Sequence, residues 1–417
     1  MWRNDSVKTF LRVTIISGLT LASTSILAGG FQVWEEDASG TGDYHASAAA
    51  EGPDAGSEFY NPATEVRRKE PQVSTGIAFI PLDINYNGLA SGNPTPTGGV
   101  TSMTRNLVPN FHLVVPIYHH LYYGFGITVP FGLKTYYPPS SFGSVGGAST
   151  ETKLIAMNYN PSFALELNKY IAIGLGFDAV GGDAVYDNLM AATTPFNNHL
   201  DGWGYGYNAG LLFQFNDDTT RIGLSYRSRV NVKASGTSIV SGFNQTIVTA
   251  QLPLPATTMF SLYQEMSPKW ALMGSVFFTN WDIFDQLLLD QTALGSILVQ
   301  ENYLNTMNVA LGVHYNATQK LMLKAGIGFD QTPTQDGYRD TRLPDNQRTA
   351  LAFGLHYQFS KDWIGDLGYA HFFSPHSSIN NNSEINPNDP MRSTIPPVVG
   401  IASISANVIG AQLSINL

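Results

Sequence analysis

The stretch WGYGYNAGLLFQF, residues 203–215, alternates two kinds of side chain with a period of two residues. One set of alternate positions carries aromatic and apolar side chains: Trp203, Tyr205, Tyr207, Ala209, Leu211, Phe213 and Phe215. The positions between them carry mainly glycine or polar residues: Gly204, Gly206, Asn208, Gly210 and Gln214. Successive side chains of a β-strand point to opposite faces. A strand with one apolar face and one small, polar face is typical of a transmembrane β-barrel, whose outer face contacts lipid.

The same period recurs from residue 71 to the end of the chain, for example in IAIGLGFDA (171–179) and RIGLSYRSR (221–229). A single alternating run is a weak signal, but repeated runs that are separated by turn residues predict an all-β chain. The fourteen expected strands are 71–86, 104–118, 121–134, 153–168, 170–181, 203–216, 219–234, 247–265, 269–284, 299–316, 319–332, 347–360, 362–374 and 399–417.

The links between these runs alternate in length. Links after even-numbered runs are tight turns, such as Tyr118-His119-His120, whereas links after odd-numbered runs are longer and rich in Gly, Pro, Asn or Ser, such as 87–99 and 374–390. Outer-membrane barrels have short periplasmic turns at one end and longer extracellular loops at the other. An even number of strands also returns the last run, NVIGAQLSINL (407–417), to the periplasmic end. These patterns predict a 14-stranded antiparallel transmembrane β-barrel over residues 71–417.

Composition favours one membrane barrel over several soluble domains. Charged residues make up 13% of the 417 residues, about half of the usual share, and aromatic residues make up 12%. The mean hydropathy is close to zero, which excludes a helical membrane protein. The net charge is −10, and an acidic chain of this kind is a poor partner for nucleic acid.

The first 28 residues have the features of a secretory signal peptide. Three basic residues among the first twelve precede VTIISGLTLASTSIL (13–27), an apolar stretch that ends in small residues. This stretch is too short to span a bilayer comfortably, so we expect cleavage after Ala28 rather than a retained anchor helix. The chain contains no cysteine. An exported chain without cysteine forms no disulfide and no thiolate metal site.

Residues 29–70 lie between the signal peptide and the first expected strand and have no helical or strand period. They nevertheless contain several large side chains: Phe31, Trp34, Tyr44, Phe59 and Tyr60. A barrel of fourteen strands is too wide for its own side chains to fill, so one interpretation is a plug inside the lumen. A periplasmic extension is the alternative. Pro62 fixes its own φ angle and favours an extended or turn conformation at Asn61, which stops the chain before the first strand.

Several short motifs follow one another in a specific order along the chain. In residues 29–70 they are GGFQ (29–32), Ser39-Gly40-x-Gly42, Asp54-Ala55-Gly56 and Asn61-Pro62-Ala63. Those in the expected barrel are VPNFHLVVPI (108–117), ITVPFGLKTYY (127–137), NYNPSFALELN (158–168), RIGLSYRSRV (221–230), LPLPATTMF (252–260), FFTNWDIF (277–284) and DTRLPDNQR (340–348). Together they resemble the outer-membrane long-chain fatty acid transporter family, FadL, whose relatives carry toluene and other aromatic hydrocarbons.

This resemblance implies a fourteen-stranded barrel in the outer membrane of a Gram-negative bacterium, plugged by an N-terminal hatch, residues 29–70. It also implies passive uptake without a cofactor or energy source, for which a monomer is sufficient. A hydrophobic molecule would be captured by extracellular loops, enter an apolar pocket beside the hatch and leave sideways through a gap at a kink in the third strand. Pro130 and Gly132 weaken that strand, so we place the gap there. Asn61-Pro62-Ala63 is then the anchor where the hatch meets the gap.

A fatty acid requires a cation for its carboxylate, because a desolvated carboxylate strongly favours Arg or Lys. Arg227 and Arg229 share a face of the seventh expected strand, Lys324 lies opposite the apolar face of the eleventh, and Lys153 begins the fourth. Cations inside barrels more often balance lumen acids such as Asp178. The sequence therefore offers candidates for the head-group partner without selecting one.

Other notable residues have simpler interpretations. Phe31 and Trp34 are expected to line the pocket or to pack within the plug. The DTRLPDNQR loop (340–348) is interpreted first as a charge-paired loop that fixes strand register. His119-His120 in a short turn are interpreted as solvated residues, because a metal site requires a further ligand nearby.

The favoured prediction is a transporter rather than an enzyme, with a long-chain fatty acid or similar hydrophobic molecule and outer-membrane lipid as partners. One alternative is an uptake channel for monoaromatic hydrocarbons. Another is a lipid hydrolase embedded in the barrel, which the absence of GxSxG, phosphate-loop and HExxH motifs does not exclude. A general porin or a surface adhesin is a third alternative.

Overall fold

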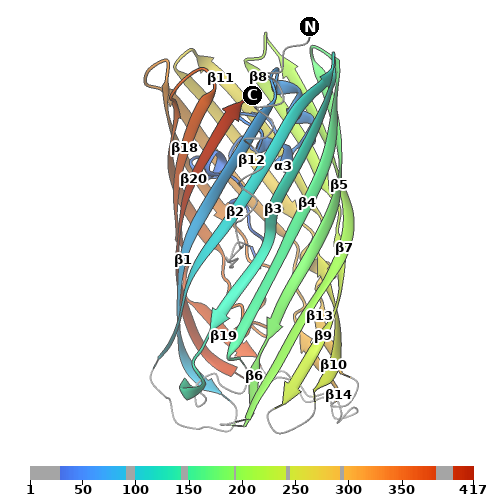
Figure 1. Ribbon diagram of the computed structural model, residues 1–417. Coiled ribbons are helices and arrows are strands. Elements are labelled where there is room, and N and C mark those ends of the chain that lie inside the picture. The colour runs from blue at the N-terminus through green and yellow to red at the C-terminus, as the bar shows by residue number, and fades with distance from the viewer. Residues whose placement is uncertain are drawn as a thin grey trace.

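The computed structural model describes residues 29–90, 99–141, 149–191, 194–240, 245–291, 295–381 and 398–417. The described strands form one closed antiparallel β-barrel, with the C-terminus at the rim that is uppermost in Figure 1. The expected signal peptide, residues 1–28, lies outside the described residues. Among the described helices, none combines the length and apolar character needed to cross a membrane.

Fourteen strands cross the wall, as the alternating runs predict. Some crossings are divided by a bulge or a short irregular stretch and consist of two segments: β5 with β6, β8 with β9, β10 with β11, β12 with β13, β14 with β15, and β18 with β19. The barrel closes between its first and last strands, where Gln72 pairs with Asn416.

The bounds of the strands are β1 Gln72–Ala90, β2 Val100–Tyr118, β3 Leu121–Tyr136, β4 Glu151–Asn168, β5 Ile171–Tyr186, β6 Asn188–Ala191, β7 Thr194–Phe215, β8 Thr220–Arg227, β9 Val230–Val240, β10 Thr246–Leu254, β11 Thr257–Ser267, β12 Trp270–Thr279, β13 Gln286–Gln291, β14 Gly295–Gln300, β15 Thr306–Asn316, β16 Leu321–Asp330, β17 Arg348–Gln358, β18 Trp363–Phe373, β19 Ser377–Asn381 and β20 Val398–Asn416.

The sequence predicts a tight turn after every second one of its fourteen alternating runs. These turns lie at the rim that carries the C-terminus (Figure 1). Tyr118 pairs with Leu121 across one of them, and Asn168 pairs with Ile171 across another. Towards the opposite rim several strands are longer than expected, and β7 begins at Thr194 rather than at residue 203. Beyond the lipid band a strand no longer needs an apolar outer face, so its sequence pattern fades before its hydrogen bonding ends.

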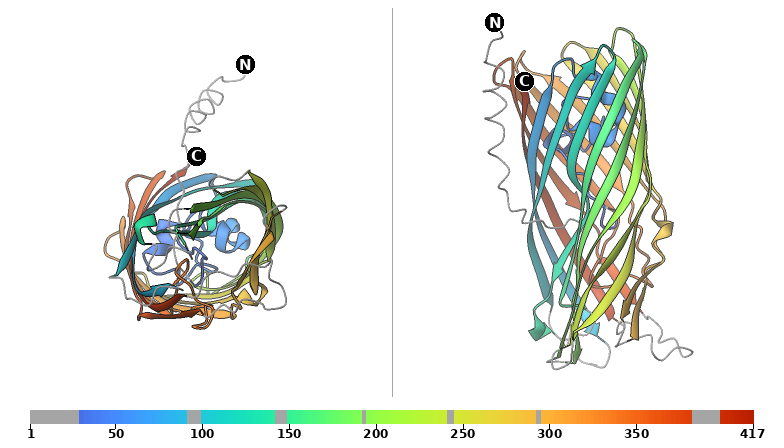
Figure 2. Two further views of the ribbon diagram at one scale, coloured as in Figure 1. Left: turned by 90° about the horizontal axis from the view of Figure 1, so that it is seen from below. Right: turned by 45° about the vertical axis from the view of Figure 1, so that its right-hand side comes forward.

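Residues 29–70, which we call the hatch, lie inside the ring of strands (Figure 2). The hatch contains the short helices α2 (Ala38–Thr41) and α3 (Ser57–Tyr60) and the 3₁₀ helix η1 (Pro62–Arg67). Two further 3₁₀ helices, η2 (Pro139–Ser141) and η4 (Trp281–Ile283), belong to the wall. Asn61 is extended, with φ −153°, immediately before Pro62, as the Asn-Pro pair predicts.

Glycines on the inner face allow the hatch backbone to approach the wall. Gly210 of β7 faces Asn61, and a Cβ atom at this position would overlap the side-chain oxygen of Asn61. Likewise, a Cβ atom at Gly223 of β8 would overlap the carbonyl oxygen of Ala49. The small residues that alternate with outward aromatic residues are therefore the contact surface for the hatch.

Replacing Gly210 by alanine should displace Asn61 and loosen the hatch, since the overlap involves a buried side chain that holds two backbone carbonyls. We expect a several-fold increase in electrolyte conductance of the purified protein in planar bilayers. Gly274→Ala on β12 is the matched control, because its Cβ atom would approach a leucine side chain at 3.2 Å and no hatch residue. Equal conductance of the two variants would contradict the need for close contact at Gly210.

Candidate functional site

The wall is broken in the middle of β3. β2 and β3 pair only as far as Phe111 and Ile127. The pairing of β3 with β4 continues, but its register shifts between Thr128 and Phe131. Pro130 lies within this shift and has no N–H group to contribute to the ladder. The strand therefore bends away from β2 at the place where the sequence carries its proline.

The first residues of the hatch occupy the edge of β3 that β2 leaves free. The N–H group of Val33 donates to the carbonyl oxygen of Pro130 at 2.8 Å, and the N–H group of Gly132 donates to the carbonyl oxygen of Phe31 at 2.8 Å. We call residues 29–34 the arm. The arm acts as a short extra strand, because it supplies the partners that buried backbone groups require.

Glu36 completes the hydrogen bonding at the break. Its Oε2 atom accepts the N–H group of Val129 at 2.9 Å. Burial raises the pKa of Glu36 to about 8, although the hydrogen bond from Val129 acts in the opposite direction. The carboxyl group is therefore protonated and uncharged at neutral pH, which avoids a buried isolated charge beside the break.

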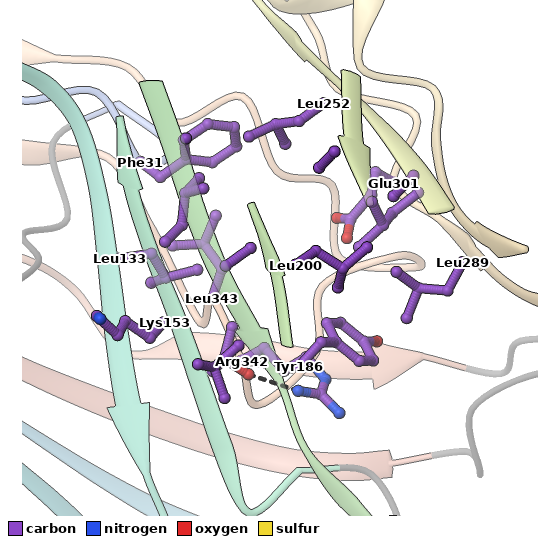
Figure 3. Close-up of a pocket in the computed structure, with 18 of the residues that line it drawn as sticks. Phe31, Leu133, Lys153, Tyr186, Leu200, Leu252, Leu289, Glu301, Arg342 and Leu343 are labelled. Carbon is purple, nitrogen blue, oxygen red and sulfur yellow. Dashed lines mark hydrogen bonds between the residues drawn. The ribbon is translucent and has the colours of Figure 1, made fainter. Parts of the chain in front are cut away.

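An apolar cavity, which we call the main cavity, lies beside the arm (Figure 3). Much of its lining is aliphatic or aromatic and includes Phe31, Leu133, Leu200, Leu252, Leu289 and Leu343. A few ionisable side chains interrupt this lining: Lys153, Glu301, Asp340 and Arg342. An apolar cavity with a small number of placed polar groups is typical of binding sites for small molecules.

Arg342 brings a buried cation to the main cavity. It belongs to the link between β16 and β17, which folds back towards the lumen. The guanidinium group donates to Thr152 Oγ1 and to the carbonyl oxygen of Asp187, the latter at 3.2 Å. It also stacks on the ring of Tyr186, with 3.4 Å between Cζ and the ring centroid (Figure 3). Because the residue is only 4% exposed, its charge is available to a molecule inside the cavity and not to bulk solvent.

The rest of the DTRLPDNQR loop holds strands and arm together. Arg348 pairs with Asp330 at 2.7 Å, which is the kind of charge pairing expected for this loop. Asp345 accepts the N–H group of Gly30 at 3.0 Å and so fixes the start of the arm. The interpretation of the loop first as structural did not select Arg342 as a candidate cation of the cavity. The available signal was Leu343, an apolar side chain in an otherwise polar loop.

A second, smaller pocket, the kink pocket, lies at the break itself. Its lining includes four residues selected from the sequence: Trp34, Pro62, Pro130 and Arg227. Phe31 of the main cavity and Phe131 of the kink pocket are neighbours, with ring centroids 6.0 Å apart. The arm therefore lies between the two pockets.

The two arginines of the seventh strand do not share a face. Arg227 points into the lumen, where it forms an ion pair with Asp178 and donates to the carbonyl oxygen of Phe59 at 2.7 Å. β8 ends at Arg227 and β9 begins at Val230. This interruption leaves Arg229 exposed, which corrects the expectation from a strict two-residue period.

The two lysines have other partners. Lys324 Nζ donates to Ser39 Oγ of the hatch at 2.6 Å and lies 3.7 Å from Asp366. Lys153 contributes to the lining of the main cavity, but its ammonium group points away (Figure 3) and pairs with Asp183 at 2.8 Å. Of the cations considered, Arg342 is therefore the best placed to meet a carboxylate in the main cavity.

Asn61 anchors the hatch at β7. Its side-chain amide donates to the carbonyl oxygens of Ala49 at 2.7 Å and Leu211 at 3.0 Å, and its Oδ1 atom accepts the N–H group of Ala63 at 3.0 Å. Pro62 of the same motif lines the kink pocket at the break, whereas the backbone partner of the free edge of β3 is the arm. Asn61 docks at β7 because Gly210 leaves room for its side chain there.

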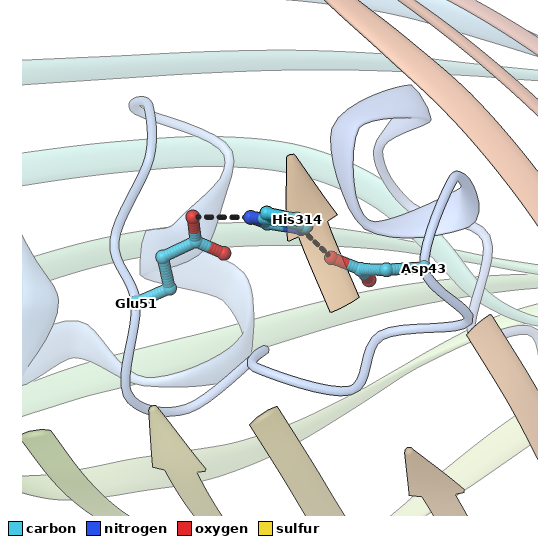
Figure 4. Close-up of side chains that lie close together, drawn as sticks. All are labelled: Asp43, Glu51 and His314. Atoms are coloured by element: carbon cyan, nitrogen blue, oxygen red, sulfur yellow. Dashed lines mark hydrogen bonds and ion pairs between the residues drawn. The ribbon is translucent and has the colours of Figure 1, made fainter. Parts of the chain in front are cut away.

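A buried histidine clamps the hatch to the wall. His314 of β15 lies between Asp43 and Glu51 of the hatch (Figure 4), with 2.6 Å from Nε2 to Asp43 Oδ2 and 3.3 Å from Nδ1 to Glu51 Oε1. Three such side chains can suggest a metal site. Here each ring nitrogen faces a different carboxylate, which a protonated ring with two N–H groups satisfies without an ion. We interpret this group, the histidine clamp, as an ionic contact between wall and hatch.

A break in the wall, an arm that covers it and an adjoining apolar cavity define a transmembrane barrel that encloses both a hatch and a cavity. The family model of "Outer membrane protein transport protein (OMPP1/FadL/TodX)" matches residues 19–416, and the chain belongs to this family. The resemblance seen in the sequence motifs is thereby confirmed, and the protein is an outer-membrane protein.

Two curated relatives illustrate the similarity over almost the whole length. The "Long-chain fatty acid transport protein" of Salmonella typhi is 31% identical over 411 residues, which cover 89% of this chain and 93% of that protein. "Outer membrane protein P1" of Haemophilus influenzae is 30% identical over 419 residues, which cover 88% and 90%.

Solved structures share the fold. A Pseudomonas aeruginosa FadL homologue has a TM-score of 0.83 at 20% identity and covers 93% of this chain and 99% of its own. The Pseudomonas putida toluene transporter TodX has a TM-score of 0.69 at 16% identity and covers 91% and 99%.

Replacing His314 by glutamine should weaken the hold of the wall on the hatch, because two buried carboxylates would lose their cation. Breaking a buried ion pair of this kind costs about 3–5 kcal/mol. We expect a lower free energy of unfolding in urea and more frequent conductance openings in planar bilayers. His119→Gln, in an exposed turn, is the control. A His314→Gln protein as stable and as closed as that control would contradict the clamp.

Proposed function

We propose that this protein takes up long-chain fatty acids passively across the outer membrane, with the main cavity as the binding site. The observation that carries this proposal is the buried guanidinium group of Arg342 in a largely apolar lining. The name of the Salmonella relative, 31% identical over nearly the whole chain, supports the same substrate class.

The two parts of a fatty acid match the two kinds of lining. Each CH₂ group that leaves water contributes about 0.8 kcal/mol, so the alkyl chain favours the apolar lining over water. The carboxylate loses its hydration on entry and requires charge-assisted hydrogen bonds, which a guanidinium group provides. Asp340 also lines the cavity, and burial raises its pKa although Arg342 opposes the shift.

The route that we propose continues from the main cavity past Phe31 to the kink pocket and from there sideways into lipid at the break in β3. Three observations support it: β2 and β3 separate after Phe111 and Ile127, the arm pairs with the free edge, and the kink pocket adjoins that edge. A molecule on this path stays in apolar surroundings, so its own gradient is sufficient to drive uptake.

Uptake of monoaromatic hydrocarbons is the second candidate, favoured by the shared fold with the toluene transporter TodX. A monoaromatic hydrocarbon has no charge, however, and gains at most a cation–π contact from a guanidinium group, whereas a carboxylate gains charge-assisted hydrogen bonds. We therefore prefer the acid. A lipid hydrolase would be revealed by turnover of phospholipid, and a general porin by a large steady conductance in planar bilayers.

Replacing Arg342 by leucine should lower the affinity for a labelled long-chain fatty acid by about 10- to 100-fold, the range expected for hydrogen bonds to a charged group. Arg342→Lys keeps the charge but not the paired donors, so an intermediate affinity is expected. The measurement is equilibrium binding to the folded protein in detergent, with unlabelled fatty-acid methyl ester, toluene and a long alkane as competitors.

The methyl ester separates a head-group role from a loss of folding. Binding of the ester should be nearly equal in wild type and Arg342→Leu, because the ester has no charge to pair. If the variant binds neither the acid nor the ester, Arg342 stabilises the fold and does not bind the head group. If toluene competes as effectively as unlabelled acid, the proposed substrate becomes a hydrocarbon. If the labelled acid shows no saturable binding, the proposal is wrong.

A further inference from the structure

Gln32 of the arm is attached to two separate parts of the wall. Its backbone lies opposite Phe131 of β3 in an antiparallel bridge. Its side chain reaches the strands β11 and β12: Nε2 donates to Thr257 Oγ1 at 3.1 Å, and Oε1 accepts the hydroxyl group of Thr279 at 3.0 Å. The residue is only 5% exposed. One side chain therefore links the broken edge of β3 to a pair of wall strands that are remote from it in the sequence.

The two threonines mark the end of a regular piece of wall. Thr257 is the first residue of β11 and Thr279 the last of β12, and the two form a pair in the β-ladder. Gln32 thus uses one amide group to hold both strands at their common end. Each hydroxyl group in turn finds a partner there, so that all three polar groups are satisfied in a buried place.

The position of Gln32 also connects it to the main cavity. The preceding residue, Phe31, lines that cavity and packs against Trp281 at 4.7 Å and Phe284 at 5.4 Å between ring centroids. A molecule that enters the main cavity therefore contacts the arm one residue away from the amide of Gln32. Movement of the arm changes the cavity lining and the cover of the β3 edge together.

The remainder of the hatch is held independently of the arm. The histidine clamp and the Asn61 anchor connect later hatch residues to β15 and β7. The arm is therefore able to leave the β3 edge while the hatch stays in the lumen. The start of the arm is fixed by the N–H groups of Gly29 and Gly30, which donate to Asp330 and Asp345. At Gln32 the hold consists of two neutral hydrogen bonds, which are weaker than buried ion pairs and therefore suit a segment that moves.

We propose that Gln32 is a positioning residue whose side chain latches the arm to Thr257 and Thr279 and thereby sets the rate at which a bound molecule passes from the main cavity to the break in β3. This inference rests on the proposed route. Gln32 and Thr257 line the kink pocket and not the main cavity, where the molecule binds, so the signature of the latch is a change in release rate at nearly constant affinity.

The test compares Gln32→Leu with the double variant Thr257→Val/Thr279→Val, which removes the same hydrogen bonds from the other side with little change in shape. Labelled fatty acid is bound to each protein in lipid vesicles, and its transfer into the lipid is followed by stopped flow. Loss of the two hydrogen bonds should raise the release rate by about 5- to 30-fold, with the dissociation constant within about 2-fold of wild type. Combining all three substitutions should add nothing further.

Thr258→Val is the matched control, because this neighbouring threonine of β11 points to the other face of the strand. An unchanged release rate in Gln32→Leu would overturn the latch. So would additive effects of Gln32→Leu and Thr257→Val/Thr279→Val on the release rate in the combined variant. A parallel fall in affinity would overturn it as well, since that would make Gln32 part of the binding site.

A reversible lock tests the movement itself. The chain has no cysteine, so Gln32→Cys/Phe131→Cys introduces one defined pair. These residues form a non-hydrogen-bonded pair, whose Cα atoms are about 4.5 Å apart and suit a disulfide. Oxidation should stop release and reduction should restore it. Release that is equally fast in the oxidised protein would show that the arm does not leave the β3 edge.

Hydrogen exchange separates this inference from the proposed function. Without any ligand, Gln32→Leu should accelerate exchange of the Val33 and Gly132 amides, which form the bonds between arm and β3, relative to Thr258→Val. If wild type binds no fatty acid but the exchange accelerates, the latch stands and the substrate assignment fails. If fatty acid binds but the exchange and release do not change, the latch fails and the substrate assignment stands.

Discussion

The pairing of backbone hydrogen bonds at the break in β3 is the constraint on which the rest of this structure depends. A strand that faces lipid cannot leave N–H and carbonyl groups without partners, because hydrocarbon offers none. Pro130 and the separation of β3 from β2 create such groups, and Val33, Phe31 and Glu36 satisfy them. The wall is therefore complete only with the hatch inside. The same contacts place Phe31 in the lining of the main cavity. The arm therefore both closes the wall and shapes the cavity.

The lumen holds the hatch by two complementary means. Glycines on the wall permit close backbone contact with the hatch, as at Gly210 and Gly223. Buried ion pairs between wall and hatch then favour one placement of the hatch. The histidine clamp is one of these, and His112 of β2 makes a similar contact with Glu58 at 2.9 Å. Because an unpaired buried charge is costly, each pair disfavours any other placement of the hatch. The arm, by contrast, is held mainly by neutral hydrogen bonds. This difference in strength divides the hatch into a fixed part and a part suited to movement.

A site for a hydrophobic molecule in a membrane barrel needs few polar or charged side chains. Most of the free energy comes from apolar contact, and lipid offers the same contact at the end of the path. The specific feature is the buried guanidinium group of Arg342 at the main cavity, held by Thr152 and by stacking on Tyr186. A guanidinium group at the cavity lining offers charge-assisted hydrogen bonds to a carboxylate, and this is the physical basis for preferring an acid over a hydrocarbon.

The alternation in residues 203–215 and its repeats determined the barrel and its strand number, because a lipid-facing strand must alternate regardless of what lies inside. Pro130 likewise revealed the place of the break, since no neighbouring structure can supply its missing N–H group. The sequence alone did not determine where the cations point. Arg229 was misplaced because a two-residue interruption after Arg227 ends the period, and Arg342 was missed because its link folds back towards the lumen. Such positions depend on contacts between segments far apart in the chain, and only the closed barrel with its hatch in place decides them.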